Sequence, residues 1–312
     1  MKKAEMTAAK KRSRLGAYNR KDIIFYAALM AFPVVQFLIF YIVVNANSLL
    51  LTFRSYDTLT GEVSWVGWDN LAEAFRMMTQ QKELLDAMGT SFLAYAISLC
   101  IGTPLALLFS FYIYKEYPAS GAFRVLLFLP SIVSAIVMVT IFQFFSDRAV
   151  PEVFRIAFGV ENVQGLIENP ETRFATVMFY NLFVSFGTST LMYSNAMDNI
   201  SPAQVDAARL EGAVGLKEFY YITFPMIYPT FSTFFITGVA TIFTNQYNLY
   251  SFFGEGSSIQ TYGYWLYVQV AGAVSQSEYP VVAAVGIFLT IIAVPLTLIV
   301  KKLLEKFGPS ED

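Results

Sequence analysis

Six strongly apolar stretches of this chain contain no charged residue over a length that can cross a lipid bilayer. A transmembrane helix needs about 20 consecutive apolar residues to cover a hydrocarbon core of roughly 30 Å. Only 14% of the 312 residues are charged, whereas soluble domains usually contain about 25% charged residues. The sequence therefore predicts an all-α polytopic membrane protein with about six transmembrane helices. The predicted spans are 23–53, 87–114, 125–146, 174–197, 219–254 and 279–300.

The basic residues predict how these spans are oriented. Cytoplasmic loops of membrane proteins carry an excess of Lys and Arg. With six spans, 15 of the 21 Lys and Arg residues fall on the cytoplasmic side. A seventh uncharged window, 256–277, would place Lys301, Lys302 and Lys306 outside if it crossed the membrane. We therefore expect both termini in the cytoplasm, and 256–277 as an external loop with an interfacial or re-entrant helix.

These spans also define the expected domains. Residues 1–22 form a basic cytoplasmic tail, 23–305 a transmembrane domain and 306–312 a C-terminal tail. The first apolar run is about twice as long as the 7–15 residues of a signal-peptide core, so we expect an uncleaved anchor. The basic tail is more typical of a topology signal than of a nucleic-acid site, and no nucleic-acid partner is expected.

Missing residue types exclude several kinds of chemistry. The chain has no histidine, which excludes Ser-His triads and His-based metal sites. None of its 18 glycines precedes a lysine, so it has no Walker A loop for a nucleotide. We expect no catalytic residue, no metal and no cofactor. A transport subunit that borrows energy from a partner fits better than an enzyme.

The segment 201–225 lies between the fourth and fifth spans and is expected to be cytoplasmic. It begins with Ser-Pro-Ala-Gln, in which Ser201 offers an N-cap and proline suits the first helical position. This pattern predicts a helix to about Glu211, a bend at Gly212 and a second helix from near Gly215.

Small and charged residues gather in this segment. Small side chains let another protein approach closely, and the charged ones can fix the register of the contact. An ordinary amphipathic interfacial loop is the alternative. The candidate residues for contact with an energy-supplying partner are Asp206, Ala207, Ala208, Arg209, Glu211, Gly212 and Ala213.

The spacing of the segment resembles a known motif. Asp206-Ala207-Ala208, Gly212, Ile222 and Phe224-Pro225 are similar to the EAA motif, E-A-A-x3-G-x9-I-x-L-P, of permease subunits in binding-protein-dependent ABC importers. Asp replaces Glu and Phe replaces Leu. The resemblance implies that 201–225 contains a coupling helix that docks on an ATPase subunit.

The six spans, the basic tail and the external sequence Gly67-Trp68-Asp69-Asn70-Leu71 resemble the oligosaccharide type of these permeases, which includes maltose and glycerol-phosphate permeases. The resemblance implies a prokaryotic inner membrane, with membrane lipid around the spans. It also implies three protein partners: a second homologous permease that forms a heterodimer, an ABC ATPase dimer and an extracellular sugar-binding protein.

Two stripes of uncharged polar residues predict a binding cavity. Polar side chains within spans are costly unless they find partners or line a wet cavity, and an uncharged polyol needs such hydrogen-bonding groups. Hydrogen bonding between neighbouring helices is the alternative explanation. The candidate substrate-binding residues are Asn181, Ser185 and Thr188 in the fourth span and Thr241, Asn245 and Tyr247 in the fifth.

The sequence therefore favours a permease subunit that imports an oligosaccharide or related polyol by alternating access, driven by separate ATPase subunits. A stand-alone facilitator or channel is one alternative. An ABC permease for a non-sugar solute is another, which is disfavoured because the spans offer no charge to a charged ligand.

Overall fold

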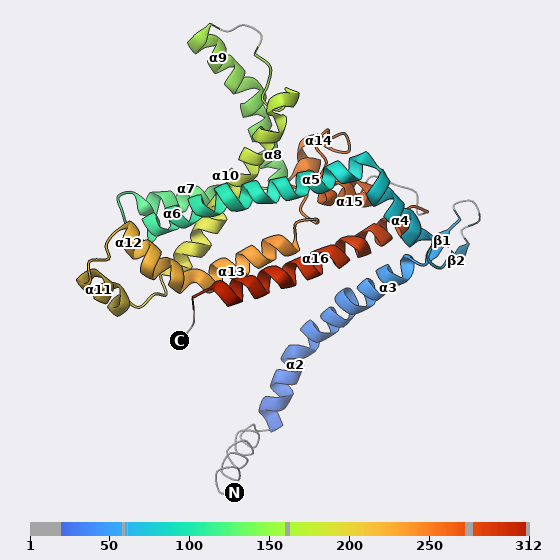
Figure 1. Cartoon of the computed structure of the whole chain (residues 1–312), viewed down its shortest axis with the longest axis horizontal. Helices are drawn as coiled ribbons and strands as arrows, with labels where there is room; N and C mark the ends of the chain where they lie inside the picture. Colours follow the sequence, from blue (N-terminus) through green and yellow to red (C-terminus); the bar gives the residue numbers. More distant parts are fainter. Residues whose placement is uncertain (1–19, 58–59, 61, 160–162, 272–276, 310–312) are drawn as a thin grey trace, which may run out of the picture.

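The computed structural model describes residues 20–57, 60, 62–159, 163–271 and 277–309, so most of the basic tail lies outside the described residues. The described chain is almost entirely helical, which confirms the all-α prediction (Figure 1). Among the described residues, five helices are long and apolar enough to cross a membrane, or up to six if one bent pair counts as a span.

The five uninterrupted candidates match predicted spans one, two, four, five and six. Their components are α2 (Arg20–Gln36), η1 (Phe37–Val43) and α3 (Val44–Leu51); α5 (Lys82–Ile97), η2 (Ser98–Gly102) and α6 (Thr103–Tyr114); α10 (Pro170–Met197); α12 (Leu216–Glu218), η4 (Phe219–Thr223) and α13 (Phe224–Ala240); and α16 (Tyr279–Phe307). The elements labelled η are π-helical turns within longer helices.

The third predicted span, 125–146, is not one continuous helix. It divides into α7 (Ser120–Ile132) and α8 (Ala135–Phe144), which meet at an angle of 104°. Pro130 cannot donate a backbone hydrogen bond, and Val133 has an extended backbone, with φ of −80° and ψ of 141°. The uncharged run predicted an apolar membrane segment here, but composition alone could not show that the helix is broken.

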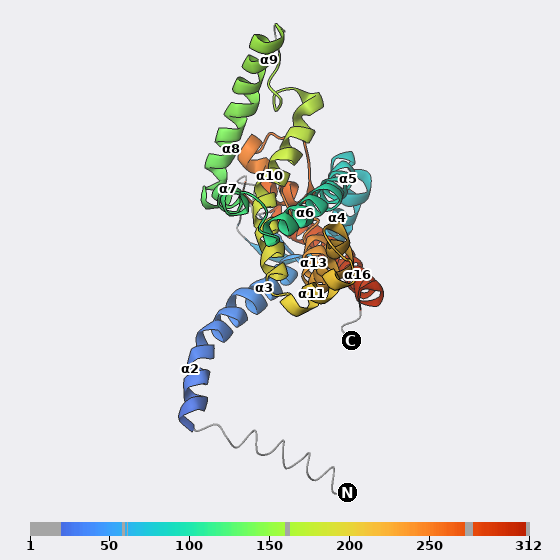
Figure 2. The same ribbon diagram turned by 90° about the vertical axis from the view of Figure 1, so that its left-hand side faces the viewer.

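The continuation of α8 forms an arm. η3 (Phe145–Ala149) and α9 (Val150–Phe158) extend it away from the body of the molecule, as Figures 1 and 2 both show. The N-terminal helices α2 and α3 project from the other side in both views. No side chain described in α3 is buried, and residues 21–50 are all exposed, so this first span has little packing within the chain.

The fifth predicted span, 219–254, is too long. α13 ends at Ala240, a turn follows, and α14 (Leu249–Phe253) is a separate short helix. The window 256–277 contains α15 (Tyr262–Ala271), which has only 10 residues and is not among the candidate spans. Its buried residues include Tyr262 and Trp265. The described residues of this window therefore contain no candidate span, and its place outside the membrane stays a prediction.

One end of the bundle is closed by the strands β1 (Arg54–Tyr56) and β2 (Val63–Trp65), which pair antiparallel, and by α4 (Asp69–Gln80). The amide of Asn70 fixes this connection, because it donates to the carbonyls of Thr52 and Arg54, each at 2.8 Å. The opposite end carries α11 (Pro202–Leu210) and α12 (Figure 1).

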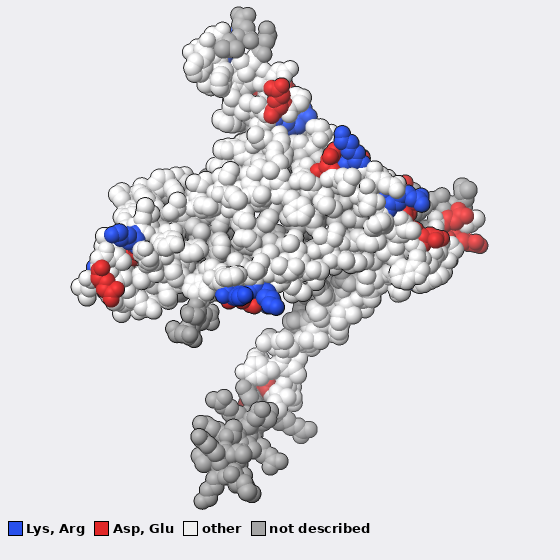
Figure 3. Space-filling view, in the orientation of Figure 1, with Lys and Arg blue, Asp and Glu red and all other residues white. Residues whose placement is uncertain are grey.

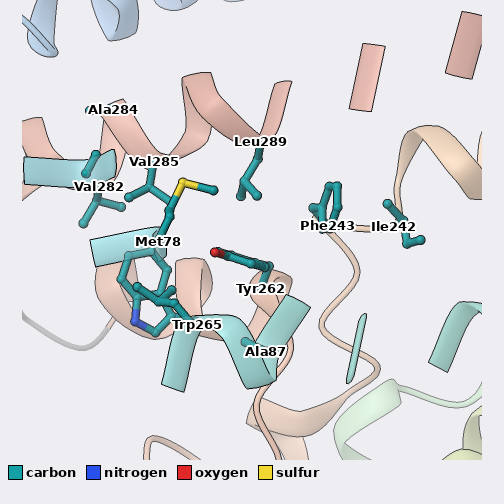
Figure 4. Packing of buried hydrophobic residues seen from close by; sticks show 12 residues of the cluster. Met78, Ala87, Ile242, Phe243, Tyr262, Trp265, Val282, Ala284, Val285 and Leu289 are labelled. Atoms are coloured by element: carbon teal, nitrogen blue, oxygen red, sulfur yellow. The ribbon is translucent and has the colours of Figure 1, made fainter. Parts of the chain in front are cut away.

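The largest core cluster lies beside α4 and α15. Figure 4 shows Met78 of α4, Tyr262 and Trp265 of α15, and Val285 and Leu289 of α16 around a common centre. A second cluster lies toward the α11 end and joins α6, α10 and α13. Its buried members are Ala106, Leu107, Phe111, Tyr193, Met197, Ile200, Val205 and Ile227.

Candidate functional site

The segment 201–225 has the predicted helix, bend and second helix. α11 ends at Leu210, and Gly212 adopts a φ of +84°, a conformation that favours glycine. The turn is closed by the Ala213 amide, which donates to the Ala208 carbonyl at 2.9 Å. α12 begins after Gly215. One detail is wrong: the Ser201 side chain forms no capping hydrogen bond with α11.

The predicted contact residues do not share one face. Asp206, Ala207, Arg209, Glu211 and Gly212 are exposed, and Ala213 is partly buried. Ala208 is only 5% exposed because its side of α11 packs inward with Val205, so the expected low-bulk surface is smaller than the sequence indicated.

The sequence analysis missed the apolar residues of this loop. Leu210 is 90% exposed, Leu216 72% and Val214 61%. The sequence pattern that could have identified them is the presence of apolar side chains beside the glycines of an otherwise polar loop. Charged side chains also gather at this end of the molecule, whereas the middle of the same face is largely uncharged (Figure 3).

A hollow of about 320 Å³ separates α11 from the start of the fifth span. Ala207 and Glu211 line one side of it, and Ile222 and Pro225 line the other. Residues from both ends of the EAA-like motif therefore lie around one depression, although Ala207 and Pro225 are 18 positions apart in the sequence.

A second cavity, of about 300 Å³, lies between the span α5–α6, α10 and α13. Five of the six candidate substrate residues line it: Asn181, Ser185, Thr241, Asn245 and Tyr247. Thr188 is exposed and does not line it. On α10 the cavity is lined by Leu182, Ser185 and Ser189. Ser189, the residue after Thr188, therefore occupies the position that was expected for Thr188.

Thr241, Asn245 and Tyr247 do not lie on a helix, contrary to the predicted stripe. They belong to the turn after Ala240, and Tyr247 has a φ of +51°. This turn is held by Asn181, whose amide nitrogen donates to the Tyr247 carbonyl at 2.8 Å. The Asn248 amide donates in turn to the side-chain oxygen of Asn181 at 2.9 Å.

Several cavity residues escaped the sequence analysis. Tyr95 and Ser98 contribute from the second span, Tyr193 from α10, and Phe231, Phe234 and Phe235 from α13. The spacing of Tyr95, Ser98 and Gly102 along one helical face was the signal that could have identified the second span. None of the residues that line the cavity is charged. The cavity thus offers hydroxyl and amide groups beside aromatic rings.

Comparison with known proteins identifies the family. A family model described as "Binding-protein-dependent transport system inner membrane component" matches residues 98–310. The chain belongs to this family. It is 28% identical over 227 residues to a probable ABC transporter permease protein, YesP, of Bacillus subtilis, which covers 71% of this chain and 70% of the relative. It is 26% identical over 282 residues to the arabinooligosaccharide permease AraP of the same organism, at 88% and 86% coverage.

A solved structure has the same fold. The crystal structure of a bacterial ABC transporter involved in the import of alginate matches with a TM-score of 0.75 and 20% identity, covering 93% of this chain and 98% of that one. The resemblance inferred from the EAA-like motif is therefore confirmed. The chain is a multi-pass permease subunit of a binding-protein-dependent ABC import system, and this family does not support a stand-alone facilitator.

Proposed function

We propose that this permease subunit imports an oligosaccharide or a related uncharged polyol. The observation that carries the proposal is the cavity between α5–α6, α10 and α13, whose lining residues are all uncharged and combine hydroxyls, amides and aromatic rings. Sugar hydroxyls need such donors and acceptors, and aromatic faces suit the apolar faces of pyranose rings. Relatives named as arabinooligosaccharide and maltodextrin permeases support the same substrate class.

The proposed substrate-binding residues are Asn181, Ser185, Thr241, Asn245 and Tyr247, and we add Tyr193. Tyr193, Asn245 and Tyr247 all line the cavity. Among the described residues, the Tyr193 and Tyr247 hydroxyls have no hydrogen-bond partner, and the Asn245 side chain only accepts, from the Tyr247 amide at 2.9 Å. These groups are therefore available to a ligand. A substrate with a net charge would meet no opposite charge in the lining.

The remaining parts of the importer are also proposals. The chain would form a heterodimer with a homologous permease, dock on an ABC ATPase dimer and receive sugar from an extracellular binding protein. It would itself hydrolyse no ATP, since it has no Walker A sequence. Both termini would be cytoplasmic, with residues 1–22 as a tail, 23–305 as the membrane domain and 306–312 as a short end.

We assign the contact with the ATPase to the exposed part of the α11–α12 loop. Asp206, Ala207, Arg209 and Glu211 supply its polar part. Leu210 supplies apolar area that would otherwise stay in water. Burying such a leucine at an interface stabilises the complex by about 1.5–3 kcal/mol.

Co-purification with the ATPase tests this assignment. Ala207→Trp and Leu210→Ala should each lower the amount of ATPase recovered per permease, because one fills the exposed surface and the other removes apolar contact. Neither should lower the amount of inserted permease, since both side chains are exposed. Phe307→Ala, which is exposed at the end of α16, is the control. Normal ATPase recovery and normal transport in both variants would refute the docking site.

Uptake by proteoliposomes that contain the whole importer tests the substrate class. A neutral oligosaccharide should compete with uptake of the labelled substrate, whereas a uronate oligomer of equal length should compete poorly, because no basic residue lines the cavity. Better competition by the uronate would contradict the neutral-polyol proposal and would favour a charged substrate.

A further inference from the structure

A buried ion pair joins the α11–α12 loop to the end of the second span. Lys115, which follows the last residue of α6, forms a salt bridge with Glu218 of α12, 103 positions further along the chain. Only 3% of the Glu218 side chain and 11% of the Lys115 side chain is exposed. In the described part of the chain, every other ion-paired side chain is at least 46% exposed.

Glu218 also contacts α11. One carboxylate oxygen, Oε1, pairs with Lys115, and the other, Oε2, lies 3.7 Å from Nε of Arg209. Arg209 directly follows the Asp-Ala-Ala sequence and lies 3.5 Å from Asp206. The single carboxylate therefore links α11, α12 and the end of α6.

The surroundings of the pair are largely aromatic. The Lys115 ammonium lies 5.0 Å from the ring centre of Tyr114 and 5.4 Å from that of Phe111. Phe111 in turn packs edge-on against Phe219, the residue that follows Glu218, at 5.2 Å. Such a site strengthens the attraction between the two charges and excludes competing water.

Stability alone explains this arrangement poorly. Removing two charges from water is costly, and replacing a buried ion pair by neutral groups of similar size is often neutral or stabilising. A buried pair does, however, fix the relative position of the segments that carry it, because a displaced charge would lose its partner in an apolar site.

We infer that Glu218 is a positioning residue for energy coupling: through Lys115 and Arg209 it makes α11, α12 and the second span move together. The second span carries Tyr95 and Ser98 of the proposed sugar cavity. Movement of α11 on the ATPase is thereby transmitted to the cavity wall as well as to α13. This inference rests on the proposed docking of α11 on the ATPase.

The test uses the complete importer in proteoliposomes, with solute uptake and ATP hydrolysis measured together. The variant Lys115→Met/Glu218→Gln removes both charges and leaves no unpaired buried ion. It should assemble in normal amounts and hydrolyse ATP, but the solute transported per ATP should fall roughly five- to tenfold. The matched control is Lys301→Met/Glu305→Gln, an ion pair whose side chains are more than half exposed, and it should keep the wild-type ratio.

Lys115→Arg keeps the charge and should also keep the transport ratio. A wild-type ratio in the neutral pair overturns the inference. A loss of assembly confined to the neutral pair also overturns it, because the ion pair would then serve folding. An equal fall in solute transported per ATP in Lys115→Arg overturns it too, because the charge would not matter. If the unmodified permease recovers no ATPase, the proposed function fails instead.

Discussion

Hydrogen-bonding side chains in the proposed sugar cavity are of two kinds: some already have partners within the chain, and others are available to a ligand. Ser185 and Thr241 already donate to carbonyls of their own segments, at 2.7 Å and 3.0 Å. The Asn181 amide nitrogen donates both hydrogens, to the Val177 and Tyr247 carbonyls, and its side-chain oxygen accepts from Asn248, so only one acceptor site of that oxygen is left for a ligand. Polar residue types in a span therefore predicted the place of the cavity, but they could not show which groups remain available, because that depends on a turn whose backbone the sequence did not reveal.

The available hydroxyl groups should contribute to sugar affinity. Tyr193→Phe and Tyr247→Phe each remove one hydroxyl and keep the ring, so packing in the cavity is retained. The loss of one polar contact with a neutral ligand costs about 0.5–1.5 kcal/mol, which raises the half-saturation concentration for transport roughly two- to tenfold. Uptake against sugar concentration, normalised to purified complex, is the measurement.

Tyr267→Phe is the control for these variants, since Tyr267 lies on α15 and does not line the cavity. Asn181→Ala should behave differently from the tyrosine variants. It frees the turn from α10, so it should mainly lower the amount of folded complex. Unchanged half-saturation in both tyrosine variants would refute their proposed role.

Close packing between α7 and α10 holds the unbroken half of the third predicted span against the bundle. A Cβ atom at Gly187 of α10 would lie 1.8 Å from the Leu127 carbonyl oxygen of α7, so only glycine fits there. Small residues allow membrane helices to approach in this way. The uncharged run predicted that 125–146 spans the membrane, but it could not predict the 104° bend after α7, where Val133 has an extended backbone.

Gly187→Ala should therefore separate these two helices. Forcing a methyl group into a packed contact costs about 1–3 kcal/mol, which should lower the midpoint of thermal unfolding in detergent. Gly89→Ala and Gly286→Ala are matched controls on α5 and α16, because a Cβ atom at either position meets nothing within 4 Å. Alanine has a higher helix propensity than glycine, so the controls should keep or gain stability. An equal loss in the controls would mean that the α7–α10 contact does not determine the effect.

At the scale of the whole molecule, two arms leave a compact bundle: the first span, and the helix pair α8–α9 (Figures 1 and 2). The sequence predicted a span at 23–53, and the structure has a helix of 31 residues there, from Lys21 to Leu51. It could not predict that this span would pack so little against its own chain, because hydropathy does not distinguish lipid or subunit contact from an internal core. The exposed apolar surface of this arm is available to lipid or to another subunit.

Orientation in the membrane is the last whole-molecule prediction. In a Cys100→Ala background, a cysteine at Gln164 should react in intact cells with a thiol reagent that cannot cross the membrane, and one at Glu305 should not. Both side chains are exposed, so burial would not prevent labelling. Permeabilising the cells should make the Glu305 position reactive, which controls for its accessibility. Labelling at Glu305 before permeabilisation would contradict the proposed orientation, because it would place the basic end of α16 outside the cell. The distribution of Lys and Arg favours the opposite orientation, with both termini in the cytoplasm.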